Sequence, residues 1–107
     1  MTLNRVQDTV VFREGEEKLT LHVSGDSFRM VAGLNKAQGK MKALTDDTNE
    51  DEFKEIALFF AGVIFGSEQA QKLLDFYNGD PGATITVCGR YFENRLGKLI
   101  AKQQKKS

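Results

Sequence analysis

Few side chains in this sequence are of a kind that catalyses reactions, and they do not occur at catalytic spacing. Cys88 is the single cysteine and His22 the single histidine. A cysteine nucleophile needs an activating neighbour, but Cys88 falls on an apolar helical stripe and His22 on the polar side of an alternating strand. One cysteine and one histidine also cannot complete a zinc site. We therefore expect no enzyme active site, no metal site and no cofactor.

The acidic run TDDTNEDE at residues 45–52 is the other group with possible chemistry. Carboxylates bind calcium, but this run lacks the glycine and the ligand spacing of an EF-hand loop. Its acids at positions 50–52 follow Thr48 and Asn49, either of which can cap a helix, and negative charge is favoured in a first helical turn. We interpret the run as the start of a helix on a solvated loop.

The balance of charge argues against a nucleic-acid or membrane partner. Fifteen basic and fifteen acidic residues leave a formal net charge of zero, so no overall field attracts polyanions. The longest apolar segment, residues 56–65, spans about 15 Å as a helix, whereas a bilayer core is about 30 Å thick. The opening residues MTLNRVQDTVVF do not resemble a secretory signal. We expect a cytoplasmic protein that is not secreted.

These residues must be positioned by an α+β fold that is mainly helical, with an N-terminal β-hairpin followed by about four helices. A chain of 107 residues suits one small domain spanning 1–107. Alternation around Gly15 predicts a hairpin at about 9–23. Apolar residues at three- and four-residue spacing predict the helices. The predicted helices lie at about 26–43, 49–65, 67–77 and 81–102, followed by a basic tail at 103–107.

Two of these helices depend on the period of their apolar residues. In the first, the apolar positions are Phe28, Val31, Leu34, Ala37 and Met41. The last begins with β-branched residues that suit a strand. Its apolar positions are Ile85, Cys88, Phe92, Leu96 and Leu99, spaced by three, four, four and three. Because strict alternation would not produce that spacing, we predict one continuous helix.

The helix at 49–65 offers the first candidate binding surface. Most of its apolar residues form an ordinary core stripe, but Leu58, Gly62 and Phe65 lie on the opposite side, with Phe59 on the flank. Either the hairpin and the last helix cover this back face, or a partner helix docks there and approaches closely at Gly62.

The last helix offers the second candidate surface. One side of it carries Arg95, Lys98, Lys102 and Lys105, and Tyr91 extends this basic ridge. The ridge is either a solvated helix face, favoured by the helix dipole, or a docking site for an acidic partner or nucleic acid.

The element order and one stretch of sequence carry a family resemblance. The stretch is Ile56-x-x-Phe59-x-x-x-Val63-Ile64-Phe65-Gly66, then Ala70-x-x-Leu73-Leu74 and the junction Asn78-Gly79-Asp80-Pro81. With the hairpin, the acidic loop and the basic last helix, it resembles the small tail assembly chaperones of long-tailed phages and prophages of Gram-positive bacteria. The resemblance covers about half of the chain.

The resemblance implies a binding protein and not an enzyme. Such a chaperone binds the tape measure protein and keeps it soluble during tail morphogenesis, until tail tube protein displaces it; a homo-oligomer is a further expectation. The resemblance assigns no individual binding residue. The alternative function is a small helix-turn-helix DNA-binding regulator, in which the helix at 67–77 reads the DNA. That helix offers only Lys72 against Glu68 and Asp75, although phosphate contacts supply most DNA affinity.

Overall fold

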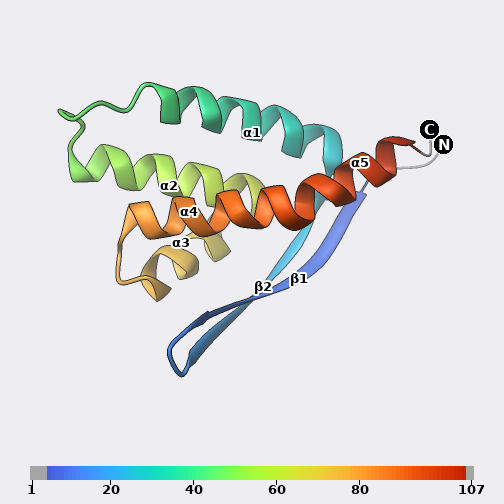
Figure 1. The fold of residues 1–107 in the computed structure, drawn as a ribbon, viewed down its shortest axis with the longest axis horizontal. Helices are drawn as coiled ribbons and strands as arrows, with labels where there is room; N and C mark the ends of the chain where they lie inside the picture. The colour runs from blue at the N-terminus through green and yellow to red at the C-terminus, as the bar shows by residue number, and fades with distance from the viewer. Residues whose placement is uncertain (1–4, 106–107) are drawn as a thin grey trace.

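The helices pack around α2, and the hairpin crosses one end of them (Figure 1). The computed structural model describes residues 5–105, with side chains as far as residue 102. The predicted hairpin followed by four helical segments is confirmed, because α4, a π-helical turn and α5 form one continuous run. The elements are β1 (Arg5–Glu14), β2 (Glu17–Asp26), α1 (Ser27–Lys42), α2 (Glu50–Phe65), α3 (Ser67–Phe76), α4 (Pro81–Tyr91), the π-helical turn (Phe92–Leu96) and α5 (Gly97–Lys105).

The hairpin is longer than predicted, and its free end extends beyond the helices (Figure 1). Val6 is fully buried, so the inward-facing apolar positions begin before residue 9. The strands pair antiparallel with Phe12 opposite Leu19. They join at Gly15, whose φ of 63° lies in the left-handed region that favours glycine.

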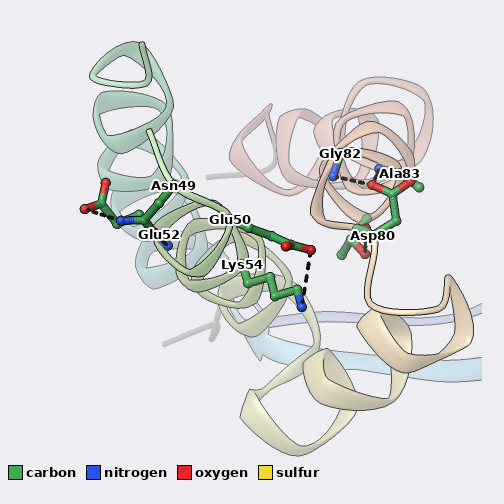
Figure 2. Close-up of polar contacts among 8 residues, drawn as sticks. Asn49, Glu50, Glu52, Lys54, Asp80, Gly82 and Ala83 are labelled. Carbon is green, nitrogen blue, oxygen red and sulfur yellow. Dashed lines mark hydrogen bonds and ion pairs between the residues drawn. The ribbon is translucent and has the colours of Figure 1, made fainter. Parts of the chain in front are cut away.

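Side-chain caps define where α2 and α4 begin (Figure 2). Asn49 accepts a hydrogen bond from the Glu52 backbone N–H at 2.8 Å, and its amide donates to the Glu52 carboxylate at 3.2 Å. Asp80 likewise accepts from the backbone N–H groups of Gly82 and Ala83 at 2.9 and 3.2 Å. Such caps satisfy donors that lack a partner within the helix. The acidic run before α2 therefore has a structural role, as its position predicts.

The central helix α2 contacts the hairpin, α1, α3 and α4. None of residues 56–65 is exposed. The neighbouring elements therefore cover a helix that is apolar on all sides. No helix in the described residues is long and apolar enough to cross a membrane.

A single residue, Gly66, separates α2 from α3. Its φ of 89° is a backbone conformation that glycine adopts without strain. The predicted bounds of α1, α2 and α3 agree with the structure to within one residue at each end. The predicted basic tail overlaps α5, which continues to Lys105; the side chains of 103–107 lie outside the described part of the chain.

The predicted continuous helix over 81–102 is confirmed, but it contains a π-helical turn that the three-and-four spacing does not predict. There the Gly97 backbone N–H donates to the Phe92 carbonyl, five residues earlier. The buried residues of this run include Cys88, Tyr91, Leu96 and Ile100. Tyr91 and Leu96 are thus five residues apart, whereas the other neighbours in this set are three or four apart. This is the offset of a π-turn hydrogen bond.

The extra residue rotates the buried face of the last helix. The sequence pattern assigns Phe92 and Leu99 to the core, but both are only half-buried. Their neighbours Tyr91 and Ile100 are buried instead. The rotation therefore turns Phe92 away from the centre of the core and Tyr91 toward the hairpin.

A pair of glycine substitutions tests the π-helical turn. A Cβ added at Gly97 would lie 2.9 Å from the Phe92 carbonyl oxygen, whereas one at Gly89 would meet open space. We expect Gly97→Ala to lower the free energy of unfolding by about 1 to 3 kcal/mol through overpacking. Gly89→Ala should raise it by up to about 1 kcal/mol, because alanine is the better helix former. Urea denaturation followed by circular dichroism measures both; equal effects would contradict the π-turn geometry.

Candidate partner-binding groove

The predicted docking surface on the back of α2 is not open. Phe65 is buried, and its ring centroid lies 5.8 Å from that of Phe12 and 5.7 Å from that of Tyr91. The prediction that Phe65 faces a partner is therefore wrong. The reason is that the hairpin and α4 cover this side of α2.

The other residues of that predicted surface face different surroundings. Leu58 and Phe59 are half-buried and pack against the core. The Lys40 ammonium of α1 lies 5.2 Å from the centroid of the Phe59 ring. Gly62 lines an open hollow of about 620 Å³ between α2, α1 and the end of β2. These residues do not form one continuous docking face with Phe65.

The predicted basic ridge on the last helix is only partly present. Tyr91 is buried, so the prediction that it extends an exposed ridge is wrong. Arg95 has a 60% exposed side chain but pairs with the carboxylate of Asp8. Lys98 and Lys102 are exposed. Among the described side chains, the outward-facing part of the ridge thus consists of these two lysines and the outer part of Arg95.

Asp8, Tyr91 and Arg95 form a polar cluster that joins β1 to the last helix. The Asp8 side chain is only 7% exposed. Its Oδ2 accepts a hydrogen bond from the Tyr91 hydroxyl at 2.9 Å and pairs with Arg95, and its Oδ1 accepts from the Thr9 backbone N–H at 2.9 Å. A buried carboxylate with this many donors has its hydrogen-bonding needs met.

The cluster keeps Asp8 ionised. Burial raises the pKa of the Asp8 carboxyl, but hydrogen bonds from Arg95, Tyr91 and Thr9 lower it by more, so the pKa lies below its ordinary value. Burial and the bond to Asp8 raise the pKa of Tyr91, which stays neutral. The sequence carries a signal for this cluster, since alternation places Asp8 on the same face as Val6 and Val10.

The structure offers no reactive group at Cys88 or His22. Cys88 is buried, and burial raises the pKa of its thiol to about 12, so the nucleophilic thiolate does not form near neutral pH. His22 lies on the outer face of the hairpin, and its Nδ1 is 3.4 Å from the Thr9 hydroxyl. The described residues contain no cluster of three or more side chains suited to hold a metal ion.

A groove with a mainly apolar lining lies between α1 and α4, with Phe60 of α2 at its base; we call it the α1/α4 groove. It forms because α1 and α4 both pack against α2 (Figure 1). Its volume is about 240 Å³. Its lining residues are Leu34, Gln38, Met41, Phe60, Ile85, Gly89, Phe92 and Glu93.

Two local features shape this groove. The π-helical turn leaves Phe92 half-buried at its wall. Gly89 has no side chain, and a Cβ there would meet nothing within 4 Å. On α1, Phe28 and Val31 precede the groove residue Leu34 at helical spacing and so lie on the same side of the helix, nearer its N-terminus. Phe28 is 79% exposed, so its expected place on the core stripe of α1 is wrong.

The sequence pattern marks most groove residues as apolar but misses their role. Leu34, Met41, Ile85 and Phe92 all fall on predicted core stripes. Leu34 is buried, and the other three are half-buried along the groove. An open apolar groove of this kind accepts the apolar side of an amphipathic helix.

Asp8 gives a pH-dependent test of the polar cluster. Its carboxyl has a lower pKa in the folded chain than in the unfolded chain. The contribution of ionised Asp8 to the unfolding free energy is therefore fully present above the unfolded-state pKa of ~3.9, and it is lost as pH falls through the pKa of the folded state. We expect Asp8→Asn to lose about 1 to 3 kcal/mol of unfolding free energy at pH 7. The difference in unfolding free energy between this variant and the native protein should become smaller below about pH 4, as measured by urea denaturation. A difference that does not depend on pH would contradict the ionised cluster.

Comparison with known proteins assigns no relative to this chain. No family model matches it, and no curated protein or solved structure matches it. Its function must therefore be inferred from the surface that its own residues form.

Proposed function

We propose that this protein is a phage or prophage tail assembly chaperone that binds helical segments of the tape measure protein and keeps that protein soluble. The observation that carries this proposal is the α1/α4 groove, an open apolar surface between two helices. The resemblance of residues 56–81 to such chaperones supports the same proposal from the sequence.

The dimensions of the groove suit a short length of helix. From Leu34 to Met41 the α1 wall is about 10 Å long at 1.5 Å per residue. A partner helix would therefore place about two turns against the lining, with apolar side chains at positions i, i+3 or i+4, and i+7. Gln38 and Glu93 provide polar atoms beside the apolar lining. Glu93 favours a partner helix with a cation at that side.

A small, open groove supports weak and reversible binding. Interfaces that bury less than about 1,200 Å² in total are typical of transient complexes. Reversibility suits the proposed role, because tail tube protein must displace the chaperone as the tube assembles. The acidic segment before α2 and the exposed Lys98 and Lys102 keep the rest of the surface polar.

The binding role is favoured over catalysis and over DNA recognition. Cys88 is buried as a thiol, and the groove brings together no nucleophile and base. The exposed side of α3 carries Glu68, Lys72 and Asp75. A surface with one cation and two acids repels the phosphate backbone more than it attracts it. We therefore propose no nucleic-acid partner.

Gly89→Leu tests the groove as the binding site. A leucine at Gly89 would occupy open space in the groove and block a partner helix. We expect at least a tenfold weaker affinity, equivalent to about 1.4 kcal/mol, for a helical peptide of the cognate tape measure protein. Fluorescence anisotropy measures the affinity, and the soluble fraction of co-expressed tape measure protein gives a second readout.

Gly39→Leu is the matched control for this experiment. Gly39 is an exposed glycine of α1, also with open space around its Cβ position, but it does not line the groove. This variant should bind like the native protein. Native affinity in Gly89→Leu would place the peptide elsewhere, and a tape measure protein that stays insoluble and unbound beside the native chain would contradict the proposed function.

A further inference from the structure

The two edges of the hairpin differ in how they are closed. Along β2, the side-chain amide of Gln69 takes the place of a neighbouring strand. Its Oε1 accepts from the His22 N–H at 2.9 Å, and its Nε2 donates to the His22 carbonyl at 2.7 Å. The same nitrogen donates to the Phe65 carbonyl at 2.7 Å, which anchors the amide to the end of α2. The helices therefore close the β2 edge at His22. Farther along β2, the outward backbone N–H groups of Thr20 and Lys18 have no partner among the described residues, and their side chains are polar.

The β1 edge is open beyond Thr9. In an antiparallel pair, backbone groups point alternately at the partner strand and away from it. The backbone N–H and C=O groups of His22 point away from β1, and His22 lies opposite Thr9. The backbone N–H and C=O groups of the odd-numbered residues of β1 therefore also point away from the partner strand. Asp8 accepts the Thr9 N–H. In residues 5–105, however, the outward backbone N–H groups of Val11 and Arg13 have no hydrogen-bond partner.

Two apolar features coincide with this open part of β1. Val11 is 45% exposed. Among the described residues, Val11 and Phe28 are the large apolar residues that are exposed. On the inward side of β1, an apolar hollow of about 310 Å³ lies between Val10, Phe12 and Val87 of α4. An open edge with apolar residues on both faces is a site for pairing with another strand.

We propose that two copies of this chain pair through their β1 strands, antiparallel and with Val11 on the two-fold axis, to form a four-stranded sheet. In this register each Val11 faces the Val11 of the second copy. Each Arg13 faces Thr9 of the second copy, and each Val10 faces its Phe12. The two Val11 residues exchange N–H···O bonds, and each Arg13 N–H donates to a Thr9 carbonyl.

The match of side chains in this register identifies a second copy as the occupant. Valine meets valine on the outer face, and valine meets phenylalanine on the inner face at both symmetry-related positions. One like-charged pair lies directly opposite in this register, Asp8 and Glu14 of the second copy. The Arg95 guanidinium that pairs with Asp8 offsets the negative charge there. A shift of two residues in either direction would place Val11 opposite Thr9 or Arg13 and would separate the two valines.

This pairing is independent of the proposed helix-binding function. No residue lines both the α1/α4 groove and the hollow beneath β1. A β1 dimer therefore leaves the groove of each copy available.

Sedimentation velocity over a range of protein concentrations tests the proposal. The native chain should shift from 12.0 kDa toward twice that mass as concentration rises. Val11→Asp would place two carboxylates together on the axis and should weaken association at least tenfold. Thr20→Asp is the matched control, because Thr20 is exposed and lies directly opposite Val11 on β2, the strand that does not take part in the proposed pairing; it should associate like the native chain.

Amide hydrogen exchange in the native protein gives a second readout that does not depend on a variant that folds. The Val11 N–H should exchange more slowly at high protein concentration, whereas the Thr20 N–H should not change. A native chain that stays monomeric, a Val11→Asp variant that associates normally, or loss of association in Thr20→Asp alone would each overturn β1 pairing. Groove affinity, measured separately with a helical peptide, would be unaffected by any of these results.

Discussion

The fold depends on covering a helix that is apolar on every side. Residues 56–65 of α2 leave no face that can be exposed to water without cost. The hairpin, α1, α3 and α4 all contact this helix. Phe65 shows the arrangement most directly, because its ring lies between Phe12 of β1 and Tyr91 of α4. The neighbouring elements are therefore placed by the need to bury α2.

That requirement also creates the proposed binding surface. Since α1 and α4 both pack on α2, a groove remains between them with Phe60 at its base. The polar cluster holds the last helix against β1 through Asp8, and the π-helical turn beside it leaves Phe92 at the groove wall. The same contacts that complete the core thus leave an apolar groove facing solvent.

Much of the fold follows from local sequence, but the candidate site does not. Alternation, Gly15 and the caps Asn49 and Asp80 predict the hairpin and the helix starts because these signals act within a few residues. The π-helical turn escapes prediction because a three-and-four spacing also fits a regular helix, and the true phase depends on the contact of Tyr91 with distant Asp8. Periodicity identifies Ile85 as apolar, but whether a neighbour covers it is a tertiary property.

The central claim is that the α1/α4 groove receives a helix of the tape measure protein. The most direct measurement is an NMR titration of the isotopically labelled native protein with a helical peptide from the cognate tape measure protein. We expect chemical-shift changes concentrated at four residues that line the groove, Leu34, Met41, Ile85 and Phe92. Changes concentrated instead on the hairpin or around Lys98 and Lys102, or no saturable changes, would contradict the central claim.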